Sequence, residues 1–124
     1  MPRRILIVED ESLIGWSMAS ALGRAGYEPM VVECAEDAVE KIRNGGFDLV
    51  ISDYRLPRMG GLDLAARVKK ISRSLPVIII SADEEIDSTE IASTREIDYF
   101  IDKPFNLNDI VTLVSGILDP RIQL

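Results

Sequence analysis

Short, uninterrupted runs of Ile, Val and Leu most limit how this chain can fold. They stand at Ile5–Val8, Leu49–Ile51 and Val77–Ile80, and a weaker run stands at Tyr99–Ile101. Runs of this kind, rich in β-branched residues, are typical of strands that are covered on both faces. We therefore expect a parallel sheet, with strands near 4–9, 28–33, 48–52, 76–81 and 98–102.

Stretches with the apolar period of a helix separate these runs. They predict helices over 12–25, 35–44, 62–72 and 107–118. Asn106 is the expected N-cap of the last helix. A short, mobile helix is expected after the fourth strand, because that segment is rich in the poor helix formers Ser and Thr. Strand–helix units joined by right-handed crossovers give a doubly wound α/β sheet, which binds ligands beyond the carboxyl ends of its strands.

The composition fits one globular domain, because 47% of the 124 residues are hydrophobic. We expect that domain to span residues 1–124, alone or as the N-terminal part of a longer protein. No segment approaches the roughly 20 apolar residues of a membrane span, and no signal-peptide core is present. A cytoplasmic location without membrane contact is therefore expected. Cys34, the one cysteine, excludes an intrachain disulfide, and the absence of histidine excludes zinc sites of the Cys/His kind.

The net charge of −7 is unevenly distributed. Residues 83–102 hold eight acids against one base, and the other acids and bases balance. Nucleic acid would be repelled there, so we expect no direct binding to it. Four bases belong to the helix expected over 62–72 or follow it, and we expect them to form a solvated face: Arg67, Lys69, Lys70 and Arg73.

Polar residues follow or close four of the expected strands. They are Glu9 and Asp10, then Asp53, Ser81 and Lys103. Neighbouring carboxylates repel one another unless a cation joins them, and oxygen ligands without His or Cys suit Mg²⁺. A carboxylate can also attack phosphorus to give an acyl phosphate. Asp53 is the candidate nucleophile, because it lies on the central strand, between the acids and the Ser81/Lys103 side.

Four motifs follow one another along the chain: Ile5–Glu11 (ILIVEDE), Asp53–Gly61 (DYRLPRMGG), Ile80–Ala82 (ISA) and Lys103–Phe105 (KPF). With these motifs the sequence resembles the CheY-like receiver domains of bacterial two-component response regulators over nearly its whole length. The resemblance implies a flavodoxin-like (βα)5 fold with strand order 2-1-3-4-5. It also implies that Asp53 accepts a phosphoryl group from the histidine of a sensor kinase or of a phosphotransfer protein.

The resemblance also assigns roles to the other residues. It implies that Mg²⁺ is held by Glu9, Asp10, Asp53 and the backbone carbonyl of Arg55. Ser81 and Lys103 would contact the phosphoryl group, with the Lys103–Pro104 peptide bond cis. Ser81 and Phe100 would form the switch that changes the face of the fourth helix and fifth strand for a downstream effector protein or domain. The acidic charge of 83–102 favours an effector with a basic surface.

The chain departs from the commonest family pattern at several positions. Glu9 stands where aspartate is commoner, and Phe100 lacks the hydroxyl of a tyrosine switch. The usual glycine before Asp98 is missing, and the last helix lacks the bases of the charge-paired dimers of one transcription-factor subgroup. We therefore do not expect that dimer.

Two further hypotheses concern single side chains. Trp16 lies off the apolar stripe of the first helix, so we expect it to be partly exposed and to contact the kinase or phosphotransfer partner. Arg55 and Asp83 flank the expected path of water to the acyl phosphate, and we expect this pair to slow hydrolysis. The chain would not be an ordinary enzyme, although it would assist its own phosphorylation and dephosphorylation.

Two other classes of function remain open at this point. One is a receiver-shaped interaction module that works without phosphorylation, which the complete set of site residues argues against. The other is a flavin-binding or hydrolytic enzyme on the same architecture. No phosphate-cradling loop for a flavin is visible in the sequence, and no obvious acid–base residue follows Asp53 at short range.

Overall fold

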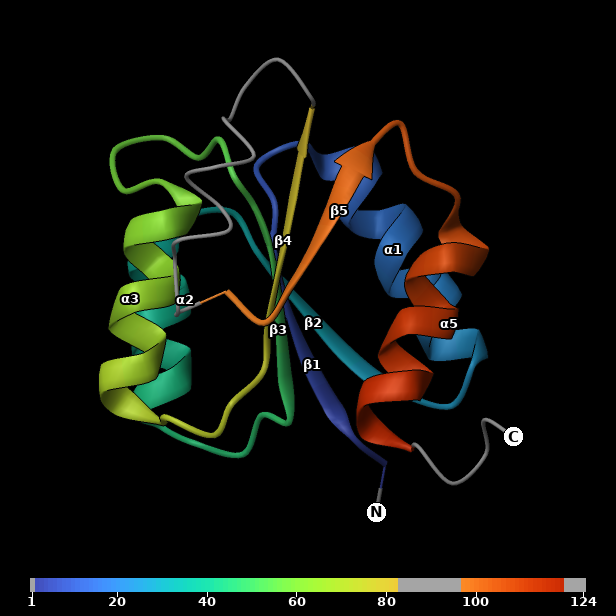
Figure 1. Ribbon diagram of the computed structural model, residues 1–124, viewed down its shortest axis with the longest axis horizontal. Helices are drawn as coiled ribbons and strands as arrows, with labels where there is room; N and C mark the ends of the chain where they lie inside the picture. The colour runs from blue at the N-terminus through green and yellow to red at the C-terminus, as the bar shows by residue number, and fades with distance from the viewer. Residues whose placement is uncertain (1, 83–96, 120–124) are drawn as a thin grey trace.

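The computed structural model describes residues 2–82 and 97–119, and it contains a parallel sheet with helices on both faces (Figure 1). The strands are β1 (Arg4–Val8), β2 (Glu28–Val32), β3 (Leu49–Asp53), β4 (Val77–Ala82) and β5 (Tyr99–Lys103). The helices are α1 (Ser12–Arg24), α2 (Ala35–Arg43), α3 (Gly61–Ile71) and α5 (Leu107–Leu118). The strand order β2-β1-β3-β4-β5 confirms the expected 2-1-3-4-5 topology.

The alternation of side chains along each strand divides the core into two layers. Ile5 and Ile7 of β1 pack with α1 and α5, whereas Leu6 and Val8 pack with α2 and α3. Figure 1 accordingly places α2 and α3 on one side of the sheet and α1 and α5 on the other. All five residues of β3 are buried, because this strand lies at the centre of the sheet and is covered on both faces.

The observed elements lie within one residue of the expected bounds. β3 ends at Asp53 rather than before it, so this carboxylate belongs to the last residue of the central strand. The expected cap of α5 is confirmed, since the Asn108 amide donates a hydrogen bond of 2.7 Å to Oδ1 of Asn106. The expected fourth helix and Asp83 lie outside the described residues.

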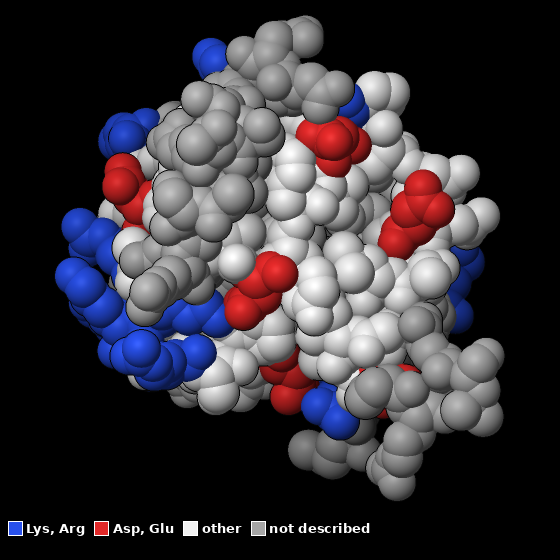
Figure 2. Space-filling view, in the orientation of Figure 1, with Lys and Arg blue, Asp and Glu red and all other residues white. Residues whose placement is uncertain are grey.

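Lys and Arg side chains gather over the α3 side of the molecule (Figure 2). The expectation that all four bases of this region are solvated is wrong for Lys69. Its side chain is only 15% exposed and forms an ion pair of 2.7 Å with Asp98. Arg67, Lys70 and Arg73 are exposed, as expected.

Within the described residues, no helix combines the length and the apolar character that crossing a bilayer requires.

Candidate functional site

The carboxyl ends of the strands bring the candidate residues to one edge of the sheet. Glu9 directly follows β1, Asp53 closes β3, Ser81 lies near the end of β4 and Lys103 closes β5. β1 and β4 both pair with β3, so Asp53 lies between the other two central strands. The parallel register alone therefore places these polar groups together.

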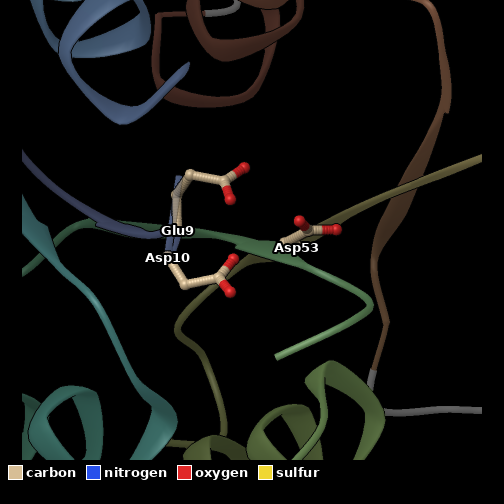
Figure 3. A group of neighbouring side chains, drawn as sticks. All are labelled: Glu9, Asp10 and Asp53. Atoms are coloured by element: carbon tan, nitrogen blue, oxygen red, sulfur yellow. The ribbon is translucent and has the colours of Figure 1, made fainter. Parts of the chain in front are cut away.

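Three carboxylates form the centre of the site. One oxygen from each of Glu9, Asp10 and Asp53 lies within 4.8 Å of the other two. Figure 3 shows the side chains of Glu9 and Asp10 extending from the end of β1 on the side of Asp53. Glu9 is 2% exposed and Asp53 is 4% exposed, whereas Asp10 is exposed. The cluster is thus reached from solvent on the Asp10 side.

The pKa of Glu9 is raised from 4.5 to about 7, mainly by burial. The negative charge of Asp53 contributes to this rise, because two neighbouring carboxylates repel each other. The Glu11 amide, which donates to Glu9 Oε2 at 3.1 Å, and the positive charge of Lys103 both act in the opposite direction. A divalent cation bound between the carboxylates would relieve the repulsion, and an all-oxygen donor set of this kind suits Mg²⁺. The residues present therefore fit such an ion.

Lys103 completes the charge balance around Asp53. Its Nζ lies 3.3 Å from Oδ2 and 3.4 Å from Oδ1 of the aspartate. The Arg55 amide also approaches Oδ1, at 3.4 Å. Asp53 is therefore held between an ammonium group on one side and two carboxylates on the other. Ser81, on the neighbouring strand, is fully buried.

The loop between β3 and α3 is held close to Asp53 by a glycine. The Gly61 amide donates to the carbonyl of Tyr54, and a Cβ at position 61 would lie 2.5 Å from the carbonyl oxygen of Asp53. Leu56 anchors the middle of the loop in the core. These contacts fix the path of the backbone that carries the Arg55 carbonyl, the expected fourth protein ligand of the cation.

The expected switch position and the cis peptide bond lie on β5 and just after it. Phe100 is half-buried and packs against the core on the α2/α3 face. The Lys103–Pro104 bond is cis, as the resemblance implied.

Trp16 is 66% exposed, which confirms the expected exposure of this side chain. Sequence reasoning missed its neighbour Leu13, which is 74% exposed and lies one helical turn earlier. The signal was present, because Leu13 also lies off the buried positions of α1. The two residues form an exposed apolar pair just after the acidic cluster.

The sequence profile of the family described as "Response regulator receiver domain" matches residues 5–115. The chain belongs to this family. A solved receiver domain protein (CheY-like) from Methanospirillum hungatei is 28% identical to the present domain, with a TM-score of 0.89 over 99% of this chain and 98% of that one. A putative response regulator from Chloroflexus aurantiacus is 30% identical, with a TM-score of 0.84 over 95% of this chain and 98% of that one.

Curated relatives of this receiver domain include longer regulators. The transcriptional regulatory protein PdtaR of Mycobacterium tuberculosis is 34% identical over 117 residues, which cover 93% of this chain and 56% of PdtaR. The DNA-binding transcriptional regulator NtrC of a Bradyrhizobium strain is 34% identical over 114 residues, covering 92% of this chain and 24% of NtrC. The chain thus spans about a quarter to about half of the length of these relatives.

Proposed function

We propose that this receiver domain is a phosphorylation-operated switch in which Asp53 accepts a phosphoryl group from a kinase or phosphotransfer histidine. The observation that supports this most is the position of Asp53, a buried carboxylate with the Lys103 ammonium 3.3 Å away and two carboxylates beside it. Such a transfer would take place in the cytoplasm, where we expect the domain to reside. The domain is not an enzyme in the ordinary sense, because it is itself the acceptor.

In the transfer, an oxygen of Asp53 attacks phosphorus as the bond from phosphorus to the histidine nitrogen breaks. The histidine of the donor leaves and takes up a proton from solvent. Glu9, Asp10, Asp53 and the Arg55 carbonyl would hold Mg²⁺, which when bound neutralises charge on the transferring group. Lys103 stabilises the phosphoryl oxygens from the β5 side, and the Ser81 hydroxyl donates a hydrogen bond to one of them once transfer is complete.

The output follows from the exchange of partners around Asp53. A phosphoryl group takes the place of the bare carboxylate as the partner of Lys103 and draws Ser81 toward it. Space beside Ser81 then lets the half-buried Phe100 ring move further inward. The balance between two pre-existing arrangements shifts, and the β5 face and the adjoining acidic segment bind an effector with a basic surface.

Trp16 and Leu13 form the proposed contact with the phosphoryl donor. An exposed Trp beside an exposed Leu has the character of a binding anchor, and the pair follows the acidic cluster directly. Trp16→Ala should slow transfer from the donor protein without slowing transfer from acetyl phosphate, which needs no docking. Ser20→Ala, on the same helix, is a control that changes no large apolar group. Equal rates with the donor protein would remove Trp16 from the contact.

Arg55 and Asp83 are proposed to lengthen the lifetime of the acyl phosphate. Arg55 is exposed and lies two residues after Asp53, and Asp83 follows β4 in the sequence. Because an exposed ion pair contributes at most about 1 kcal/mol to stability, we expect its effect to be detected in the dephosphorylation rate. Arg55→Ala should shorten the half-life of the phosphorylated domain. An unchanged half-life would contradict the role.

Intact-mass spectrometry after incubation with acetyl phosphate tests the main proposal. Wild type should gain the mass of one phosphoryl group with Mg²⁺ and not with EDTA. Asp53→Asn should gain none under either condition. If wild type gains no mass at all, the domain would instead be an interaction module that works without phosphorylation, and the search would turn to partners of the unmodified protein.

A further inference from the structure

The edge strand β5 has little apolar burial to fix its register. None of its five residues is buried, whereas all five residues of β3 are. Among the described residues it pairs with β4 alone. Register is strongly specified where a strand is buried and weakly specified where it is not. Phe100 and Ile101 still contact the two core layers, but both are only half-buried, so contacts outside the core can help to determine which residue of β5 faces which residue of β4.

Asp98, the residue before β5, makes two hydrogen bonds to one residue of β4. Its amide donates to the carbonyl of Val77 at 3.0 Å, and its Oδ2 accepts from the Val77 amide at 2.8 Å. The side chain thus continues the ladder where the backbone alone would leave the Val77 amide without this bond. Two bonds between the same two residues fix their relative position along the strand direction.

Lys69 of α3 fixes Asp98 in turn. Its Nζ donates to Oδ2 of Asp98 at 2.7 Å and to the carbonyl of Leu75 at 2.6 Å. The two acceptors precede β4 and β5, so the ammonium group joins both strand starts to the end of α3. With its side chain 15% exposed, Lys69 is well shielded for a lysine. The Lys69 ammonium is thus held in place by two short hydrogen bonds and is not a solvated surface charge.

The position of Lys103 depends on this arrangement. The observed register pairs Ile78 with Tyr99 at one end of β5 and Ala82 with Lys103 at the other. A slip of one residue would move β5 by about 3.3 Å and turn every side chain to the opposite face. Lys103 would then lose its 3.3 Å contact with Asp53. The contact at the site therefore requires the register that Asp98 supports.

We propose that Asp98 and Lys69 are positioning residues, which fix the register of β5 and thereby hold Lys103 against Asp53. The phosphorylation readout of this inference rests on the function proposed above, and the register readout does not. The competing interpretation is an ion pair that contributes only to stability. The two interpretations differ in what happens at the opposite end of the strand.

Asp98→Ala removes the acceptor, and Lys69→Met removes the ammonium while keeping the apolar stem. With acetyl phosphate as donor, each variant should be phosphorylated roughly tenfold to a hundredfold more slowly than wild type, because displacement of a charge-stabilising group by about an ångström can cost up to about a hundredfold in rate. Mg²⁺ affinity should stay within about twofold, since its ligands lie on β1, β3 and the following loop rather than on β5. Asp98→Asn keeps an oxygen acceptor and should largely restore the rate.

Two controls separate positioning from stability. Tyr27→Phe removes hydrogen bonds of 3.0 Å to Ser115 and Asp119 beside the start of β2, the edge strand opposite β5, so it perturbs the fold away from β5. It should leave the phosphorylation rate unchanged. Combining Asp98→Ala with Lys103→Met should give no further loss over Lys103→Met alone, because both changes act through the same ammonium group.

The register can be measured without phosphorylation. Backbone nuclear Overhauser effects between β4 and β5, such as those around Ile80 and Ile101, should persist in Tyr27→Phe and weaken or shift in Asp98→Ala and Lys69→Met. If these signals and the phosphorylation rate match wild type in both Asp98→Ala and Lys69→Met, the proposal is wrong. A loss of rate that parallels a loss of Mg²⁺ binding also overturns the proposal. So does a loss of rate that adds to the loss caused by Lys103→Met. Failure of wild type to accept phosphate counts against the proposed function, and the register signals then decide this inference alone.

Discussion

Replacing Glu9 by glutamine should stabilise the metal-free protein at pH 8. The physical reason is the raised pKa of Glu9, which is about 7 in the fold against 4.5 for an ordinary glutamate. Below pH 4.5 both the folded and the unfolded chain carry the proton, so the group has no effect on stability. Between the two pKa values the folded protein keeps a proton that the unfolded chain loses, and the free energy of unfolding falls as the pH rises.

The size of the effect follows from the shift. A difference of about 2.5 pKa units corresponds to a loss of about 3 kcal/mol from the free energy of unfolding. This loss is complete once the pH is above 7. Screening by solvent at the open Asp10 side reduces this figure, so about 3 kcal/mol is its upper bound. Glutamine keeps the shape and an oxygen that can accept from the Glu11 amide, but carries no charge. In a domain of this size, the gain at pH 8 corresponds to a rise of roughly 10 °C in Tm.

Urea unfolding followed by circular dichroism, with EDTA present, gives the free energies at pH 5 and pH 8. The free energy of unfolding of Glu9→Gln should exceed that of wild type at pH 8, and the two values should differ much less at pH 5. Glu40→Gln, at an exposed position on α2, should change stability by less than about 0.5 kcal/mol at either pH. Saturating Mg²⁺ should reverse the order, because the ion stabilises the protein that binds it more tightly. Equal stabilities at pH 8, or a difference independent of pH, would refute the reasoning.

Three other outcomes are expected. Mg²⁺ affinity, measured by isothermal titration calorimetry, should weaken about tenfold per pH unit below 7, because binding must displace the proton of Glu9; a flat profile from pH 5 to 7 would contradict this. Gly61→Ala should cost about 1–3 kcal/mol in urea unfolding, since its Cβ would lie 2.5 Å from the Asp53 carbonyl oxygen, whereas Gly60→Ala meets nothing closer than 3.5 Å. Asn106→Ala should lower the free energy of unfolding by about 1 kcal/mol through loss of the α5 cap. Asn106→Asp should retain most of the stability, because its carboxylate can accept the same hydrogen bond.

The parts of the fold that could be predicted are those with a local pattern. Ile5–Val8 and Val77–Ile80 are uninterrupted apolar runs, as expected of strands that are covered on both faces. Such a run can be recognised in the sequence without knowing which strands pair with it. The cap of α5 is equally local, since Asn106 bonds a residue two positions away. Once the strands were located, a parallel sheet required their carboxyl ends to share one edge, and the acidic cluster followed.

Which of the site carboxylates is buried could not be predicted from the composition. Glu9 and Asp10 are adjacent acids in the sequence, yet Glu9 is buried and Asp10 is exposed. The difference arises because the Glu9 amide still bonds the carbonyl of Val32, which continues the pairing of β1 and β2 by one residue. The side chain of Glu9 is thereby directed inward. The raised pKa is a consequence of this register and could not be predicted before the pairing was known.

The pairing of Lys69 with Asp98 lay further beyond prediction, because the two residues are 29 positions apart and each belongs to an unremarkable local pattern. The contact has a counterpart at the other end of β5, where Lys103 meets Asp53. From Asp53 the chain continues through the loop fixed by Gly61 and along α3 to Lys69, and from Asp98 along β5 back to Lys103. The two lysine–aspartate contacts therefore connect both ends of β5 to the segment that runs from Asp53 to Lys69. Phosphorylation of Asp53 would change only one of them, so we expect the Asp98 end of β5 to stay fixed while its Lys103 end responds.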